Sequence, residues 1–302
     1  MYQQHFGLTE KPFNLTPDTQ FFCQLAPHQE ALNVLLLALN NDEGFIKIIG
    51  DVGTGKTLIC RKLLNELDSR YRTAYLPNPH LTPAGLGKAV ADEFVVHYPQ
   101  HSSQQYILHA LYQHLVQIAH QGQQAVLVID EAQSMSLETL EALRLLTNLE
   151  TEKHKLLHIV LFAQPELDSV LNQPAIRQLK QRITFSYQLR SLKQAEVARY
   201  IKHRLSIANC PRETLFSQSA IHALYCYSRG IPRLINILAH KAMLAAYGRN
   251  LSTVGHQQIL AAAQDTEDCS KSVQQQRHKK YGHRLLAIII VSLSLYYASE
   301  QV

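Results

Sequence analysis

The sequence predicts an α/β protein in which a doubly wound parallel sheet of five strands precedes a small all-helical domain. Three observations lead to this prediction. Short apolar runs alternate with helical patterns up to about residue 190, as in strands that are connected by helices. One of these runs leads through a glycine-rich loop into a helix. After residue 191 only helical periodicity continues, which predicts a separate helical domain.

The alternation gives the expected elements in order. Strands are expected at residues 45–49, 73–76, 125–129, 157–162 and 183–187. Helices are expected at residues 26–40, from 58 onward, and at 102–120, 136–149, 193–208, 217–229, 232–247 and 254–263. Gly230, Pro232 and Gly248 are typical residues of helix ends. The expected domains are 1–190 with the sheet and 191–264 with the helices, followed by a polar basic linker at 265–284 and a hydrophobic helix at 285–298.

The glycine-rich loop fits the phosphate-binding pattern G-x-x-x-x-G-K-[ST]. We expect its glycines to adopt conformations closed to side chains, so that backbone N–H groups and the helix N-terminus face a phosphate. Lys56 would contact the β- and γ-phosphates, and the Thr57 hydroxyl would ligate Mg²⁺. The expected nucleotide-binding residues are Gly50, Asp51, Val52, Gly53, Thr54, Gly55, Lys56, Thr57 and Leu58.

A buried strand at residues 125–129 ends in two acids, Asp130 and Glu131. Ligands of open α/β sheets bind at the carboxyl ends of the strands, where both carboxylates are expected. Asp130 would hold the hydrated Mg²⁺, and Glu131 would act as general base toward the attacking water. The alternative, a surface acidic pair after a strand, does not explain the glycine loop that precedes it. The pattern predicts ATP and Mg²⁺ as ligands.

Composition excludes some other classes of protein. The net charge is +5, but five basic residues and one acid lie beyond residue 268, so residues 1–268 carry only about +1. This gives no overall basic footprint for nucleic acid, and no nucleic-acid partner is expected. The five cysteines have no paired or metal-type spacing, which predicts reduced thiols. The first residues lack a basic and apolar signal sequence.

The apolar run at 285–298 has fourteen residues, fewer than the roughly twenty of a spanning helix. Tyr296 and Tyr297 suit a membrane interface, and the neighbouring basic residues all precede the run. The alternative is a buried core helix. We expect a membrane segment because no later sequence is present to cover such a helix. The ATPase domain would then be cytoplasmic and bound to the inner membrane.

With these motifs in order, the chain resembles AAA+ ATPases, and more narrowly the ExeA/GspA group of secretion ATPases, especially its MSHA pilus branch. The opening residues 2–22 and the motifs at 130–133, 164–167 and 230–236 carry this narrower resemblance, which covers about residues 1–265. It implies ATP hydrolysis by a homo-oligomer that assists a type IV pilus or type II secretion apparatus. It also implies a membrane protein of that apparatus as partner, and a helical lid.

The resemblance assigns further residues. Gln164 takes the sensor position at the end of the fourth strand, where a strand-end hydrogen bond is the alternative role. Arg233 takes the second sensor position, where a structural salt bridge is the alternative. Arg182, or else Arg177, would be an arginine finger given to a neighbouring subunit; a solvated arginine is the alternative for either.

Two more residues are weaker candidates. Asn78 could restrain Glu131 until a partner binds. His28 would lie near the adenine, or else be a surface histidine at a helix N-terminus.

Other functions compete with this interpretation. ExeA-type proteins continue into a periplasmic peptidoglycan-binding domain, whereas this sequence stops at Val302, so direct peptidoglycan binding is not expected. A nucleic-acid-associated AAA+ switch of the transposition or replication-initiator type is the rival function, because it shares the lid motif at 230–233. A scaffold that binds nucleotide without hydrolysing it is disfavoured by Glu131.

Overall fold

The computed structural model describes residues 2–151, 155–212 and 214–269, and these residues form two compact units. One unit is Pro17–Arg190, which contains the sheet, and the other combines Met1–Thr16 with Ser191–Val302. The sheet unit ends at Arg190 and the helical unit resumes at Ser191. The first sixteen residues differ from the expectation, because they belong with the helices and not with the sheet.

The sheet unit is a parallel α/β fold of five strands in the order β2-β3-β4-β1-β5. Its strands are β1 Phe45–Gly50, β2 Tyr71–Leu76, β3 Gln124–Ile129, β4 Leu157–Ala163 and β5 Phe185–Leu189. Its α-helices are α2 Ala26–Asn40, α3 Lys56–Glu66, α4 Pro83–Glu93, α5 Gln104–His120, α6 Leu137–Leu146, α7 Glu166–Leu171 and α8 Arg177–Arg182. Short 3-10 turns are η1 Thr19–Phe21, η2 Ala132–Ser134 and η3 Pro174–Ile176. The expected doubly wound parallel sheet is confirmed.

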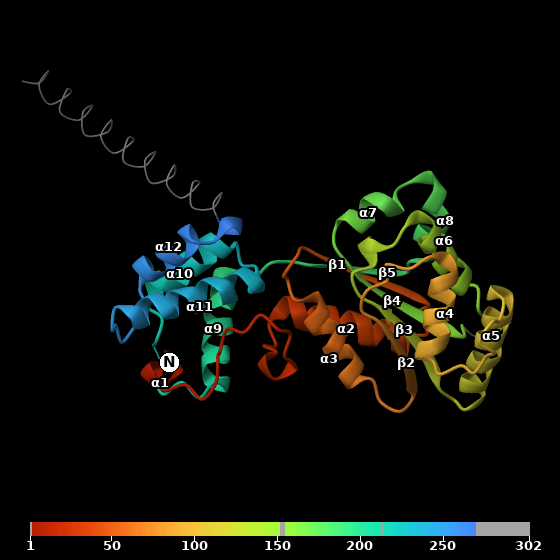
Figure 1. Ribbon diagram of the computed structural model, residues 1–302, viewed down its shortest axis with the longest axis horizontal. Coiled ribbons are helices and arrows are strands. Elements are labelled where there is room, and N and C mark those ends of the chain that lie inside the picture. Colours follow the sequence, from red (N-terminus) through yellow and green to blue (C-terminus); the bar gives the residue numbers. More distant parts are fainter. Residues whose placement is uncertain (1, 152–154, 213, 270–302) are drawn as a thin grey trace, which may run out of the picture. The chain divides into compact units, whose positions relative to one another are not determined.

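Helices cover both faces of this sheet (Figure 1). Alternate residues of β1 point to opposite faces, as strand geometry requires. Ile46 and Ile48 join the apolar core beneath α2 and α3, whereas Phe45 and Ile49 join the core beneath α4 to α8. Burial on both faces explains why the strands read as continuous apolar runs. Lys47 interrupts the run in β1 and forms an ion pair with Asp168 of α7.

Three helices of this unit were not expected from the sequence. Helix α4 contains Gly85 and Gly87, which lower helix propensity, but a Cβ on Gly87 would lie 3.3 Å from Leu108 of α5. Close packing between the two helices therefore accounts for that glycine. The other two, α7 and α8, are single short turns of six residues without a long apolar stripe. Strand β5 is shifted by two residues toward the C-terminus from its expected position.

The helical unit contains α1 Tyr2–Phe6, α9 Gln194–Ile207, α10 Gln218–Ser228, α11 Pro232–Gly248, α12 His256–Gln264 and the turn η4 Glu267–Cys269. Two phenylalanines attach the first sixteen residues to it. Phe6 and Phe13 are buried, and the Phe13 ring lies edge-on to Phe216 with centroids 5.8 Å apart. The Thr9 N–H also donates to the Ala208 carbonyl at 3.0 Å. These contacts explain why the segment departs from the expected boundaries.

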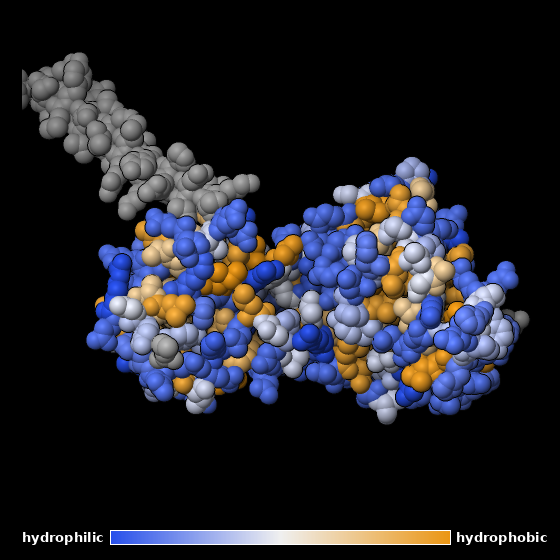
Figure 2. All heavy atoms as spheres, in the orientation of Figure 1, coloured by the Kyte–Doolittle hydropathy of each residue, from blue (hydrophilic) through white to orange (hydrophobic). Residues whose placement is uncertain are grey.

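The first five residues of the expected linker at 265–284 belong to the helical unit, and its remaining residues lie outside the described ones. Residues 265–269 continue the helical unit, because Cys269 is fully buried and Lys241 bonds to the Asp265 carbonyl. The predicted hydrophobic segment 285–298 lies outside the described residues. Within residues 2–151, 155–212 and 214–269, no helix is both long and apolar enough to cross a membrane. The face shown in Figure 2 is mainly hydrophilic, with scattered apolar patches on both units.

Candidate active site

The glycine loop joins β1 to α3, as the sequence predicts. Gly53 and Gly55 have φ values of 79° and 105°, in the left-handed region that favours glycine. Gly50 differs from the expectation, because it is absent from the positive-φ glycines. A Cβ on Gly50 would lie 2.8 Å from Thr54 Oγ1 and 3.1 Å from the Leu189 Cβ. Gly50 is therefore required for close packing and not for its dihedral angle.

His28 fixes the loop from the N-terminus of α2. The side chain is 5 % exposed, and its Nε2 lies 2.9 Å from the Thr54 carbonyl oxygen. A carbonyl only accepts hydrogen bonds, so Nε2 carries the proton and donates. The Thr54 hydroxyl in turn donates to the Asp51 carbonyl at 2.8 Å. The alternative of a surface histidine is wrong, since His28 is buried and holds the backbone of the loop.

Lys56 begins α3 and is buried beside the loop, with 5 % of the residue exposed. Its Nζ donates to the carbonyls of Gly50 at 2.7 Å and Asp51 at 3.1 Å. Burial lowers the pKa of this ammonium, and nearby carboxylates, Glu131 and Asp130 foremost, counteract the shift. A cation that is held by neutral carbonyls in a buried loop can be stabilised further by an anion. This geometry suits the predicted contact with phosphate.

Thr57 and Asp130 bring two oxygen ligands together. The Thr57 Oγ1 donates to Asp130 Oδ2 at 2.7 Å, although 73 residues separate them in sequence. Asp130 follows β3 and is 2 % exposed. Burial raises the pKa of its carboxyl, while hydrogen bonds from Thr57 and the Glu131 N–H oppose that shift. A hydroxyl beside a desolvated carboxylate is a hard-oxygen set that fits Mg²⁺, as the sequence predicts.

Glu131 is held by two amide side chains. The Nε2 atoms of Gln133 and Gln164 both donate to Glu131 Oε2, at 2.5 and 3.0 Å. Gln164 follows β4, which lies next to β3 in the sheet, so its predicted position brings it to the carboxylate. Glu131 itself has φ 53° and ψ 37°, a left-handed conformation that is uncommon for glutamate. Such conformations concentrate at functional sites.

The sequence did not single out Gln133 as a site residue. The sequence feature that could have indicated Gln133 is its position two residues after Glu131, at the end of the motif 130–133. Asn78, which was expected to restrain Glu131, is exposed, and its side-chain oxygen accepts from the His80 N–H at 3.3 Å. The restraint on Glu131 therefore comes from the two glutamines and not from Asn78.

The three predicted arginines have different surroundings. Arg182 is half-buried at the end of α8, and its guanidinium donates to the Thr147 carbonyl at 3.4 Å. Arg177, at the start of α8, is exposed. Arg233 is exposed at the second residue of α11 in the helical unit, after Pro232. A cation in the first turn of a helix opposes the helix dipole, so the fold gains nothing from Arg233 there.

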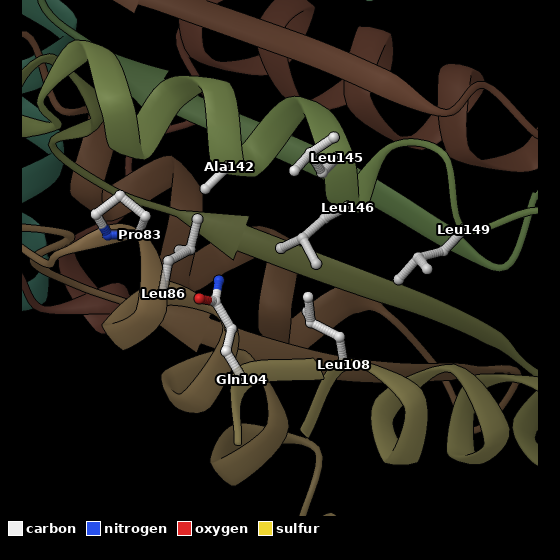
Figure 3. Close-up of a pocket in the computed structure, with 9 residues that line it drawn as sticks. Pro83, Leu86, Gln104, Leu108, Ala142, Leu145, Leu146 and Leu149 are labelled. Carbon is white, nitrogen blue, oxygen red and sulfur yellow. The ribbon is translucent and has the colours of Figure 1, made fainter. Parts of the chain in front are cut away.

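A separate hollow in the sheet unit lies among α4, α5 and α6 (Figure 3). Its volume is about 70 Å³, and its lining is apolar except for Gln104. Leu86, Leu108 and Leu146 point into it from the three helices. It brings no charged side chain together, so it offers no chemistry comparable to that of the acids beside the glycine loop.

Comparison with known proteins agrees with this geometry. Residues 39–171 match the AAA domain family. Over 263 residues the chain is 41 % identical to General secretion pathway protein A of Aeromonas hydrophila, covering 87 % of this chain and 48 % of that protein. The chain therefore spans about half the length of this relative. The AAA match and this relative support an ATPase that is similar to GspA.

Solved structures show the same fold. Cdc6p of Pyrobaculum aerophilum has a TM-score of 0.63 at 18 % identity, covering 82 % of this chain and 70 % of that chain. The Aeropyrum pernix ORC2 protein has 0.58 at 17 % identity, covering 83 % and 72 %. The Thermotoga maritima RuvB branch migration motor has 0.53 at 17 % identity, covering 78 % and 67 %. At these identities the likeness extends to the AAA+ fold alone.

Proposed function

We propose that this AAA-type ATPase hydrolyses ATP with Mg²⁺ and uses the cycle, as a membrane-attached homo-oligomer, to assist a secretion or type IV pilus apparatus. The observation that carries the chemical part is the hydrogen bond of 2.7 Å between Thr57 and Asp130, directly beside the held carboxylate of Glu131. This bond supports a shared Mg²⁺ site, because it joins an oxygen of the glycine loop helix to an oxygen of the acidic strand.

Each residue of this site has a role in phosphoryl transfer. Thr57 and Asp130 would hold Mg²⁺, which bridges phosphate oxygens and neutralises their charge. The Lys56 ammonium would contact the β- and γ-phosphates that the loop N–H groups surround. Glu131 would accept a proton from the attacking water, and Gln164 would help to fix the direction of that carboxylate.

Assembly into a homo-oligomer would complete the site. An arginine finger stabilises the charge of the transition state and must reach out of its own subunit. Arg177 meets that requirement better than Arg182, because Arg177 is exposed and Arg182 donates to Thr147. Arg233 would act from the helical unit as a second sensor. Its exposed position at a helix N-terminus supports a functional role.

The cellular role rests on the relative and on the sequence. The name of the Aeromonas protein refers to general secretion, and the 41 % identity runs over 87 % of this chain. Within that group we propose an MshM-like role in MSHA pilus biogenesis. The apolar run at 285–298, with basic residues before it, would attach the ATPase to the cytoplasmic face of the inner membrane.

Hydrolysis is tested with the full chain, ATP and Mg²⁺. Lys56→Ala is expected to abolish nucleotide binding, and Glu131→Gln to abolish hydrolysis while nucleotide still binds. Glu267→Gln is the matched control, because Glu267 is exposed in the helical unit, and it is expected to behave as wild type. Full activity of Glu131→Gln would refute the assignment of the base.

Membrane attachment is tested by fractionating cells that express the full chain or a chain ending at residue 272. This end point keeps the buried Cys269, which packs with the helical unit. The full chain is expected in the membrane fraction and the shorter chain in the soluble fraction. Equal partition of both would refute attachment through the apolar run. Tight, salt-sensitive DNA binding by the shorter chain would favour the rival, nucleic-acid-associated function.

A further inference from the structure

Glu131, Gln133 and Gln164 form a closed ring of hydrogen bonds. The Gln133 Nε2 and the Gln164 Nε2 donate to the same oxygen, Glu131 Oε2. The other end of the Gln133 amide is also used, because its Oε1 accepts the backbone N–H of Gln164 at 2.9 Å. Gln133 therefore connects the carboxylate with the end of strand β4 through both atoms of its amide group.

The ring leaves the two oxygens of the Glu131 carboxylate with different partners. Both amides occupy Oε2, and within the described part of the chain Oε1 accepts no hydrogen bond from protein. The backbone of Glu131 is fixed as well, since it stands in the left-handed region at the start of η2 and its carbonyl accepts the Ser134 N–H at 2.9 Å. A strained residue keeps such a conformation only where its surroundings determine it. One carboxylate oxygen is thus held and the other is presented.

Gln133 is poorly placed for a purely structural role. It is half-buried in a 3-10 turn of three residues and lies outside both apolar cores of the sheet unit. Replacing it therefore opens no cavity in the core. Its hydrogen bonds instead go to the carboxylate and to the residue after β4, both of which belong to the proposed hydrolytic site.

We propose that Gln133 is a positioning residue for ATP hydrolysis, which holds Glu131 Oε2 so that Oε1 accepts the proton of the attacking water. Gln133 also makes the direction of the base depend on Gln164, because one amide bonds to both residues. This inference rests on the proposed role of Glu131 as general base. In this role Gln133 acts through Glu131, to which its amide donates.

The test compares Gln133→Met with wild type in the full chain. Methionine has a similar length but no amide, so the carboxylate loses one donor and its connection to Gln164. Loss of orientation by a fraction of an ångström to one ångström is expected to lower kcat by about 10- to 100-fold. The KM for ATP, the Kd of a non-hydrolysable ATP analogue and the Tm are expected to stay within about twofold or one degree of wild type, as for positioning that acts after binding.

Two further variants complete the design. Gln117→Met is the matched control, because Gln117 is exposed on α5, and it is expected to leave kcat unchanged. Gln133→Glu keeps the size and polarity of the side chain but lacks the N–H donors when ionised. It is expected to lose kcat as Gln133→Met does, and it decides the question if the methionine variant lowers the Tm.

The double variant Gln133→Met/Gln164→Met tests the ring itself. Because the two glutamines hold one oxygen and bond to each other, the fold-losses in kcat are expected to combine to clearly less than their product. Losses that multiply would mean independent roles and would overturn the proposal. An unchanged or raised kcat in Gln133→Met would also overturn it, as would a loss that a weaker Kd for the analogue fully explains.

Glu131→Gln in the same assay separates two kinds of failure. If Glu131→Gln hydrolyses ATP like wild type, the proposed base assignment is wrong and the inference falls with it. If Glu131→Gln is inactive while Gln133→Met is fully active, only the inference about Gln133 is wrong.

Discussion

The two acids after β3, Asp130 and Glu131, form what we call the acidic edge of the sheet. Their side chains are held by more hydrogen bonds than those of the three candidate arginines. Asp130 and Glu131 are fixed within one unit by Thr57, Gln133 and Gln164 at distances of 2.5 to 3.0 Å. Arg177 and Arg233 are exposed, and Arg182 makes one long contact of 3.4 Å. The folded subunit therefore prepares the metal ligands and the base by itself. Under the proposed function, the arginines would gain their order from movement or assembly.

The largest expected effect concerns the finger. Arg177→Ala is expected to lower hydrolysis by at least about 10³-fold with unchanged ATP binding, as for fingers in related chemistry. Arg182→Ala is expected to lower it by less than about tenfold, since that side chain already bonds to Thr147. Steady-state hydrolysis at several protein concentrations measures both variants. A larger loss in Arg182→Ala would reverse the assignment.

Mixed assemblies provide the control for this prediction. Arg177→Ala subunits retain Glu131, and Glu131→Gln subunits retain Arg177, so mixing the two inactive proteins is expected to restore part of the activity. No restoration at any mixing ratio would argue against a finger given in trans.

Asp130→Asn tests whether the charge of Asp130 lowers the stability of the fold while it serves ATP hydrolysis. Hydrolysis is expected to fall by about 10²-fold or more, because the proposed Mg²⁺ ligand loses its charge. Burial raises the pKa of Asp130 in the folded state, so the stability that the protonated carboxyl contributes is present at low pH and is lost as pH rises through that pKa. At pH 7 without nucleotide the neutral asparagine is therefore expected to raise the Tm by a few degrees.

The measurement for Asp130→Asn is thermal unfolding from pH 7 down to about pH 4, the ordinary pKa of an aspartate. The gain in Tm over wild type is expected to shrink as the pH falls, because the wild-type carboxyl then becomes protonated. A gain that does not depend on pH would show that something other than the charge of Asp130 is responsible.

Breaking the ion pair between Lys47 and Asp168 is expected to have a smaller effect, on stability and not on hydrolysis. Lys47 has 11 % of its side chain exposed, so Asp168→Asn leaves a largely buried ammonium without its charged partner. We expect a loss of about 1–3 kcal/mol in the free energy of unfolding, below the usual range for buried pairs because Asp168 is 46 % exposed. Lys47→Met, which removes the buried charge, is expected to cost less. Chemical denaturation measures both, and the reverse order would contradict the explanation.

The smallest effect is expected on the arginine side. Arg233→Ala removes a cation from the first turn of α11, which is expected to stabilise the helical unit by about 0.3–1 kcal/mol. The same variant is expected to lower hydrolysis severalfold. Denaturation and hydrolysis are measured on one preparation. A clear loss of stability would show that Arg233 serves the fold, contrary to the comparison with the acidic edge.

Local patterns explain what the sequence could predict. The path from β1 through the glycine loop to α3 was predicted because an apolar run, three glycines and a helical stripe stand next to each other. Thr57 and Asp130 were paired in the prediction because parallel strands end at one edge of the sheet. Helix α4 was missed because its glycines lower helix propensity. Gly87 is explained by close packing against Leu108 of another helix, and a local sequence pattern does not reveal that contact.

The same limit applies to the site and to the domain boundary. Gln133 belongs to the motif 130–133, but sequence spacing does not give the direction of a side chain in a 3-10 turn. Its partner Gln164 is also 31 residues away. The place of residues 1–16 depends on contacts such as that of Phe13 with Phe216, about 200 residues later. Contacts between distant parts of the chain decided both outcomes.

The chain enters the sheet unit from the helical unit after Thr16 and returns to it after Arg190. The two units are thus joined by two peptide connections, like a domain inserted into another. A protease that cuts either connection leaves the units linked through the remaining one, so a single nick cannot release the ATPase core.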